Sequence, residues 1–175
     1  MGITLRARHI LGTCILLAAC GGSSGTREEA APTTPPGQPG SPRVLVIDPS
    51  AVVVNALVSG LQDSVRTVVS DDSAWRQLWN QVYSIASPMP PVPVVNFSQD
   101  RLIVAALGSR PSAGYSVAID SVTTENGATT VYVTRQGPGA SCMNATLMTA
   151  PVQVVRVSGD LGIMSFRETA RVVDC

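Results

Sequence analysis

The chain has 175 residues, of which 45% are apolar and 4% aromatic, and its formal net charge is zero. This length is sufficient for one domain of ordinary size, with a core built from Val, Leu, Ile and Ala. Phosphate contacts need clustered cations, and the sequence contains no basic run, so we expect no nucleic-acid partner.

Residues 1–19 predict a signal peptide. Arg6 and Arg8 provide a positive start, and residues 10–19 form an apolar stretch that ends in small residues. This stretch is too short to cross the ~30 Å hydrocarbon core of a bilayer as a helix. A positive start followed by a short apolar stretch is typical of a secretory signal.

The sequence Leu17-Ala18-Ala19-Cys20 resembles the bacterial lipobox. The resemblance implies lipid attachment at Cys20, with a diacylglycerol on the sulfur and a further acyl chain on the freed amine. Two or more chains anchor a protein stably in a membrane. The residue after Cys20 is Gly21 rather than Asp, which by analogy with envelope sorting favours the outer membrane. An ordinary cleaved signal with a coincidental cysteine is the alternative.

Residues 20–42 predict the lipidated cysteine and a disordered tether. They are rich in Gly, Ser, Thr and Pro and offer almost nothing apolar to bury. We therefore expect a folded domain at 43–175, held near the bacterial membrane through the lipid anchor. Its first runs predict strands: RVLVI at 43–47, AVVVNALVSG at 51–60 and SVRTVVS at 64–70.

An amphipathic helix is predicted for residues 71–86. Apolar residues recur there at the spacing of one helix face. They are Trp75, Leu78, Trp79 and Val82. Ser70, Asp71 and Asp72 suit the start of the helix, and the proline-rich segment 88–93 ends it. We expect both tryptophans to face the core, the alternative being an exposed aromatic patch for a sugar or a membrane.

The rest of the chain predicts strands separated by turns. RLIVAALG at 101–108 is continuously apolar, which indicates burial on both faces. GYSVAIDSV at 114–122 and TTVYVTR at 129–135 alternate, with the hairpin signal Asn126-Gly127 between them. PVQVVRVSG at 151–159 and ARVVD at 170–174 complete the set. The predicted fold class is mostly β (α+β), an antiparallel sheet or sandwich-like domain with one amphipathic helix.

The cysteines predict one disulfide. Cys14 leaves with the signal peptide and Cys20 takes lipid, which leaves Cys142 and Cys175 in an oxidising compartment. Two free thiols are the alternative. A metal site is disfavoured because zinc wants four ligands and the mature chain has no histidine to add.

The residue types of common catalytic sites are missing. The chain has no Lys, and its one histidine is His9, within the predicted signal peptide. Ser-His-Asp, Cys-His and Ser-Lys arrangements need an imidazole or an amine. We therefore expect a non-enzymatic protein without cofactor, metal or small-molecule substrate. A hydrolase that uses a carboxylate pair is the alternative.

Several segments resemble the PrcB-like C-terminal domain family. They are AWRQLW, VNFSQDRLIVAALGSRPSAGYSVAIDSV, VYVTRQGPGASC and APVQVVRV, and together they span about residues 72–175. The chain departs from the usual family pattern at Asn96, Ala113 and Val152. The family is named for a lipoprotein subunit of a bacterial cell-surface protease complex. The resemblance implies a non-catalytic envelope protein that binds and stabilises or modulates a protease, and a structural envelope lipoprotein is the alternative.

The segment SRPSAGY at 109–115 is the candidate contact loop. It also resembles the Asn-Pro-Thr-Thr-Gly loop of chagasin-type cysteine-protease inhibitors, which are immunoglobulin-like β domains. The residues assigned to partner binding are Arg110, Pro111, Ser112, Gly114 and Tyr115. Gly-Pro-Gly at 137–139 is a candidate second loop. In the simpler interpretation, Gly114 supplies a positive φ for a turn and Tyr115 packs inward.

Overall fold

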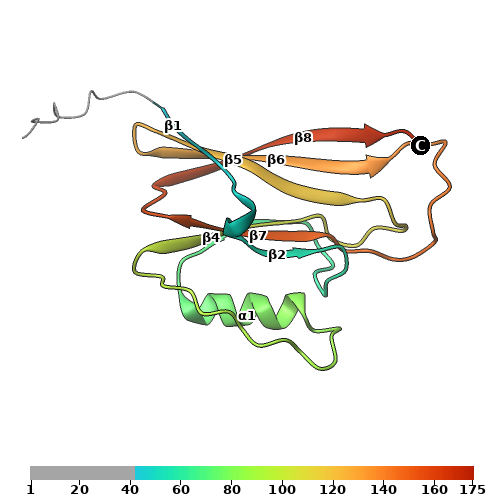
Figure 1. The fold of residues 1–175 in the computed structure, drawn as a ribbon, viewed down its shortest axis with the longest axis horizontal. Helices are drawn as coiled ribbons and strands as arrows, with labels where there is room; N and C mark the ends of the chain where they lie inside the picture. The colour runs from blue at the N-terminus through green and yellow to red at the C-terminus, as the bar shows by residue number, and fades with distance from the viewer. Residues whose placement is uncertain (1–41) are drawn as a thin grey trace, which may run out of the picture. The chain divides into compact units, whose positions relative to one another are not determined.

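The computed structural model describes residues 42–175, and these residues form three layers (Figure 1). One helix packs on a sheet of strand order β2-β7-β4-β3, here called the helix-side sheet. A second sheet of order β1-β5-β6-β8, here called the outer sheet, covers its other face. The predicted signal peptide, Cys20 and the predicted tether up to residue 41 lie outside the described residues.

The elements follow one another closely along the chain. Their bounds are β1 Arg43–Val46, η1 Pro49–Ala51, β2 Val52–Ala56, β3 Val65–Val69, α1 Asp72–Val82, β4 Asp100–Ala106, β5 Ser116–Glu125, β6 Ala128–Pro138, β7 Val152–Ser158 and β8 Ile163–Val173. The mostly β class with a helix is therefore confirmed. Within residues 42–175, no helix has both the length and the apolarity to cross a bilayer.

A short 3-10 turn, η1, carries the chain from the outer sheet to the helix-side sheet. Asp48 caps this turn and accepts a hydrogen bond from the Ser50 N–H at 2.8 Å. Hydrogen bonds from the Ser50 hydroxyl and the Ser50 N–H lower the pKa of Asp48 below its usual value. The turn separates β1 from β2, so two neighbouring apolar runs belong to different sheets.

Helix α1 begins where its capping residues predict. Asp71 is the N-cap, and its side chain accepts a hydrogen bond from the Ala74 N–H at 2.8 Å. The helix ends at Val82, four residues before the predicted end at 86. The Val82 carbonyl accepts from the Gly60 N–H at 2.9 Å, and the Ser84 hydroxyl donates to the Gln81 carbonyl at 3.0 Å. The Gln81 and Val82 carbonyls at the end of the helix thus accept hydrogen bonds from outside it. This capping satisfies the two carbonyls without a further helical turn.

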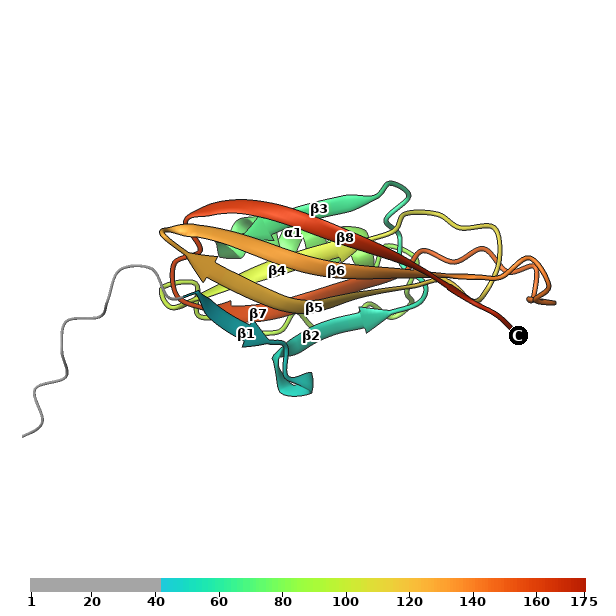
Figure 2. The same ribbon diagram turned by 90° about the horizontal axis from the view of Figure 1, so that it is seen from above.

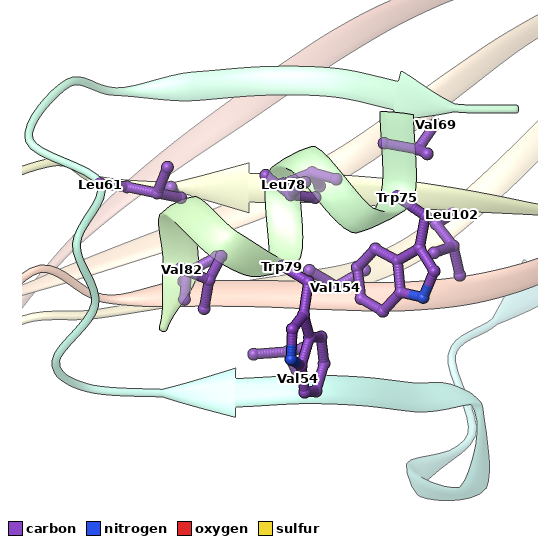
Figure 3. Close-up of a cluster of buried hydrophobic side chains, with 12 residues drawn as sticks. Val54, Leu61, Val69, Trp75, Leu78, Trp79, Val82, Leu102 and Val154 are labelled. Atoms are coloured by element: carbon purple, nitrogen blue, oxygen red, sulfur yellow. The ribbon is translucent and has the colours of Figure 1, made fainter. Parts of the chain in front are cut away.

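The predicted apolar face of α1 is buried, which confirms the inward orientation of both tryptophans (Figure 3). Trp75 is fully buried, and Trp79 lies against it with ring centroids 5.2 Å apart in an edge-on arrangement. The Trp75 Nε1–H donates to the Pro93 carbonyl and the Trp79 Nε1–H to the Pro90 carbonyl, each at 2.9 Å. The proline-rich segment thus satisfies both indole donors while it returns toward β4.

Strand β4 is buried on both faces, as its continuous apolar sequence predicts. Leu102, Val104 and Ala106 belong to the cluster beneath α1. Ile103 and Ala105 belong to the cluster between the two sheets. The alternation of side chains along a strand produces this division, and it makes β4 common to both cores.

The turn between β5 and β6 is the predicted hairpin. Asn126 has φ of 50° and Gly127 φ of 77°, the left-handed conformations that a two-residue hairpin turn requires. β5 and β6 pair antiparallel from Ser116–Gln136 to Glu125–Ala128, with one irregularity near Ile119. This long hairpin carries the candidate contact residues at its far end.

Strand β8 departs from the predicted antiparallel arrangement. It pairs with β6 in parallel, from Ala128–Ile163 to Pro138–Val173, and is longer than the predicted segment 170–174. The chain passes from β6 to β7 in the other sheet and then returns, so β8 runs in the direction of β6. Its first half was missed because the polar residues of "IMSFRET" dilute the apolar signal.

Candidate partner-binding site

The candidate contact loop lies between β4 and β5, and a neighbouring segment holds it in place. The Arg110 N–H donates to the Thr149 carbonyl at 2.7 Å, and the Thr149 N–H donates to the Arg110 carbonyl at 3.0 Å. The Thr149 hydroxyl donates to the Ser112 carbonyl at 2.9 Å, and the Ala113 N–H to the Ala145 carbonyl at 3.1 Å. The loop is therefore one side of a two-segment structure rather than a free-standing projection.

Arg110 and Tyr115 form a pair at the base of this loop. The Arg110 Nη2–H donates to the Leu107 carbonyl at 2.8 Å, and the guanidinium carbon lies 5.9 Å from the centre of the Tyr115 ring. This distance is at the limit of a cation–π contact. Both side chains are half-buried, so their surroundings restrict the positions that they can adopt.

The other predicted contact residues differ in exposure. Pro111 and Gly114 are exposed, and Ser112 is half-buried with its hydroxyl donating to the Ala113 carbonyl at 3.1 Å. Gly114 has φ of +91°, and a Cβ there would lie 2.9 Å from the Asn144 Oδ1 atom. The turn interpretation therefore explains Gly114, and Tyr115 packs on the inter-sheet core as that interpretation expects. The contact role of the loop stays a prediction.

Residues 137–139 do not form a second loop beside the first. Gly137 and Pro138 are the last residues of β6, and only Gly139 lies beyond it. A Cβ on Gly137 would lie 3.2 Å from the Tyr115 ring, so this glycine lets the aromatic ring approach the strand closely. Strand packing thus explains Gly137.

A cavity of about 240 Å³ lies next to the Arg110–Tyr115 pair, and we call it the Arg110 cavity. Three parts of the chain line it. They are Leu107, Arg110 and Tyr115 around the loop, Arg135, Gln136 and Gly137 on β6, and Ala170, Arg171 and Val172 on β8. The cavity therefore opens at the end of the sandwich where β6 and β8 finish.

Strand alternation shows which of these arginines face the cavity. Val131 and Val133 are buried in the inter-sheet core, so Arg135 projects from the same inner face of β6. On β8, Met164 and Phe166 pack inward, which places Arg171 on the outer face and leaves its backbone as the cavity contact. Arg110 and Arg135 are therefore the two cations of the Arg110 cavity.

The charges around the cavity are unbalanced. Glu168 places Oε1 2.7 Å from the Arg66 Nε and Oε2 3.7 Å from the Arg135 Nε. Among residues 42–175, Arg110 has no carboxylate oxygen within 4.0 Å. One carboxylate thus serves two arginines, and Arg110 adds a further positive charge that suits an anionic group.

The predicted disulfide is present and lies beyond the ends of β6 and β8. Cys142 and Cys175 are bonded, with a Cα–Cα distance of 5.2 Å. The Gly139 N–H donates to the Val173 carbonyl at 2.8 Å, which continues the β6–β8 ladder toward the disulfide. The bond fixes the end of β8 to the segment that braces the contact loop. No cluster of potential metal ligands occurs in the part of the chain that the structure describes.

Sequence reasoning missed Arg135 and Glu168. They are separated by 33 positions in the sequence and lie on β6 and β8. No local sequence pattern predicts that these two strands pair in parallel. Arg66 comes from a third strand in the other sheet. Only the assembled sandwich brings these side chains together with Arg110.

Residues 101–158, from β4 through β7, match the family described as PrcB C-terminal. This segment is similar to the PrcB C-terminal family. The match is shorter than the expected span of residues 72–175, and it includes neither α1 nor β8. Arg110, Tyr115 and Arg135 lie within the matched segment, whereas Glu168 lies beyond it. No curated protein and no solved structure gives a significant match to the chain.

Proposed function

We propose that this chain is a non-catalytic, lipid-anchored binding module of the bacterial cell envelope that stabilises or modulates an envelope protease. The observation that carries the proposal is the PrcB C-terminal match at residues 101–158. The Arg110 cavity supports it, because a half-buried arginine and tyrosine at the rim of a cavity are residue types that anchor protein partners.

The anchoring part of the proposal depends on Cys20. Leu17-Ala18-Ala19-Cys20 supplies the lipobox pattern, and Gly21 favours the outer membrane. Metabolic labelling with a radioactive fatty acid should mark the wild-type chain and not Cys20→Ala. Labelling of both would place the lipid elsewhere, and labelling of neither would remove the anchor from the proposal.

The non-catalytic part rests on composition. The chain lacks Lys, and its histidine precedes Cys20, so the usual nucleophile-activating groups are absent from the proposed mature protein. Turnover of a peptide or glycoside by purified protein, abolished by one carboxylate substitution, would contradict this part.

The binding part is tested by capture from envelope extracts. The bound fraction is labelled with active-site-directed protease probes, and protease activity is measured with and without added chain. Wild-type protein should retain a labelled protease, and Arg110→Gln should retain several-fold less. Arg76→Gln is the matched control, because Arg76 lies on the exposed face of α1 and is 62% exposed in its surface ion pair.

The same assay distinguishes the ways in which the chain could act. A longer-lived, active protease indicates stabilisation, whereas loss of its activity indicates inhibition of the chagasin type. Retention of porins or cell-wall proteins without a protease would contradict the proposal and favour a structural envelope role.

A further inference from the structure

Strand β8 is an unusually long sheet edge. The two sheets end in β1, β2, β3 and β8, and the first three have four or five residues whereas β8 has 11. Figure 2 shows β8 along one margin of the outer sheet. Natural proteins usually keep edges short or protect them, because an open edge is a template for another strand. A long edge at the end of a cavity is therefore a candidate binding surface.

The hydrogen bonds to β6 show which backbone groups of β8 remain free. The Ile163 N–H donates to the Gly127 carbonyl, and the Val173 carbonyl accepts from the Gly139 N–H. In a parallel ladder, every second residue of a strand directs its N–H and its carbonyl to the same neighbouring strand, and the residues between them direct theirs to the opposite side. The odd-numbered residues of β8 therefore bond to β6. The N–H and carbonyl groups of Ala170 and Val172 point to the edge that no strand pairs within residues 42–175.

The same two residues reach the Arg110 cavity. Ala170 and Val172 share the inward orientation of Met164 and Phe166, yet Val172 is 70% exposed. Past Glu168, the inner face of β8 therefore lacks the cover that the helix-side sheet gives to the first half of the strand. A strand added here would form hydrogen bonds with the free backbone groups of Ala170 and Val172. Its side chains would lie within reach of Arg110 and Arg135, the two cations of the cavity.

We propose that the β8 edge at Ala170 and Val172 binds an extended peptide segment of a partner protein as an added strand. An Asp or Glu side chain of that segment occupies the Arg110 cavity between Arg110 and Arg135. Main-chain hydrogen bonds supply affinity in this mode of recognition, and the side-chain cavity supplies specificity. The inference deepens the proposed binding function and rests on it for the source of the segment.

Charge favours an acidic segment over a second copy of the chain. Both oxygens of Glu168 already face arginines, so the β8 strand of a second copy brings no free carboxylate. A partner carboxylate would complete the pairing of Arg110 and Arg135, and hydrogen bonds between ionised groups are about twice as strong as neutral ones. The Cys142–Cys175 bond holds the strand end in place, which reduces the ordering cost of binding.

The probe is a short acetylated and amidated peptide of alternating Thr and Val with one central Glu. Its binding to the purified full chain is measured by fluorescence anisotropy. A matched peptide carries Gln in place of Glu, and another has N-methylated amides along one edge. The Glu peptide should bind about tenfold more tightly than the Gln peptide, which corresponds to one charge-assisted contact. N-methylation should abolish binding.

Protein variants test the two halves of the site separately. Arg110→Gln and Arg135→Gln should each weaken binding of the Glu peptide several-fold and leave binding of the Gln peptide unchanged. Arg167→Gln is the control, because it removes a cation from the outer face of the same strand. Ala170→Pro removes the N–H that points to the free edge of β8 and leaves the hydrogen bonds to β6 in place. It should therefore weaken binding of both peptides.

Hydrogen exchange on the unmodified chain keeps the test independent of any variant's folding. Bound Glu peptide should slow exchange of the Ala170 and Val172 amides, and it should not slow exchange along β1. Equal affinity for the Glu and Gln peptides, protection elsewhere only, or self-association through β8 would overturn the inference. If capture retrieves no protease but the peptide still protects these amides, the proposed function fails and the inference stands. Protease capture without amide protection contradicts the inference alone.

Discussion

The Arg66 Nε lies 2.7 Å from the Glu168 Oε1 and joins the edge strand β3 of one sheet to the edge strand β8 of the other. Arg66 also donates to the carbonyls of Val65 and Ala106, at 2.7 and 2.6 Å. A charged residue that points inward from an edge strand discourages unspecific strand addition. Glu168 therefore disfavours unspecific strand addition near the middle of β8.

Arg66→Ala should destabilise the domain by about 1–3 kcal/mol. The substitution removes the guanidinium that donates hydrogen bonds to the Val65 and Ala106 carbonyls, and it also removes the ion-pair partner of Glu168. Glu168→Gln should cost less, about 0.5–1 kcal/mol, since its side chain is 35% exposed and solvent screens the pair. Urea unfolding of both single variants and the double variant gives the coupling energy. Fully additive effects would show that the two side chains do not interact in solution.

The tryptophans of α1 should dominate the stability of the helix layer. Trp75→Ala should cost about 3–5 kcal/mol, because it leaves a cavity at a fully buried position. Trp79→Phe should cost about 1–2 kcal/mol, because the Pro90 carbonyl loses its donor. The control Arg76→Gln should stay within about 0.5 kcal/mol of wild type in the same unfolding experiment. A small effect of Trp75→Ala would contradict the packing of α1 on the sheet.

Two glycines with positive φ form a matched pair. Gly127→Ala should cost about 1 kcal/mol, because φ is 77° but no atom lies within 4 Å of the added Cβ. Gly114→Ala should cost about 2–3 kcal/mol, because its φ is 91° and the Cβ would also meet Asn144 and Pro138. Thermal unfolding of both variants measures the difference. Equal costs would show that the contact loop can move away from the segment that braces it.

Removing the disulfide should loosen the end of β8. The bond closes a loop with a sequence separation of 33, so the double variant Cys142→Ser, Cys175→Ser should lose roughly 3–4 kcal/mol. Amide exchange at Arg171 and Val173 should accelerate more than exchange in the β5–β6 hairpin. Uniform acceleration across the domain would mean that the bond acts on the unfolded chain alone.

Local patterns in the sequence were sufficient for most elements. The stripe from Trp75 to Val82 predicts α1, the continuous apolar run predicts the doubly buried β4, and Asn126-Gly127 predicts the hairpin. Each of these signals arises from neighbours along the chain. The fold class follows because many short strands and one helix admit few arrangements.

The parallel pairing of β8 and the composition of the Arg110 cavity were beyond local reasoning. The register of β8 depends on two crossings between the sheets, and its first half lacks a continuous apolar pattern. Arg110 was identified as a candidate through its loop, but Arg135 and Glu168 acquire significance only through contacts between strands. The predicted second loop at 137–139 was wrong because Gly137 and Pro138 continue β6, where Gly137 packs against Tyr115.

Pulse-chase measurement of the envelope protease in the native host tests the proposed function most directly. The protease recovered by capture is followed in cells that contain the wild-type chain, no chain, Arg110→Gln or Arg76→Gln. Its half-life or its activity per molecule should change when the chain is absent, should change in the same direction with Arg110→Gln, and should stay at the wild-type value with Arg76→Gln. A protease whose lifetime and activity are identical with and without the chain would contradict the account.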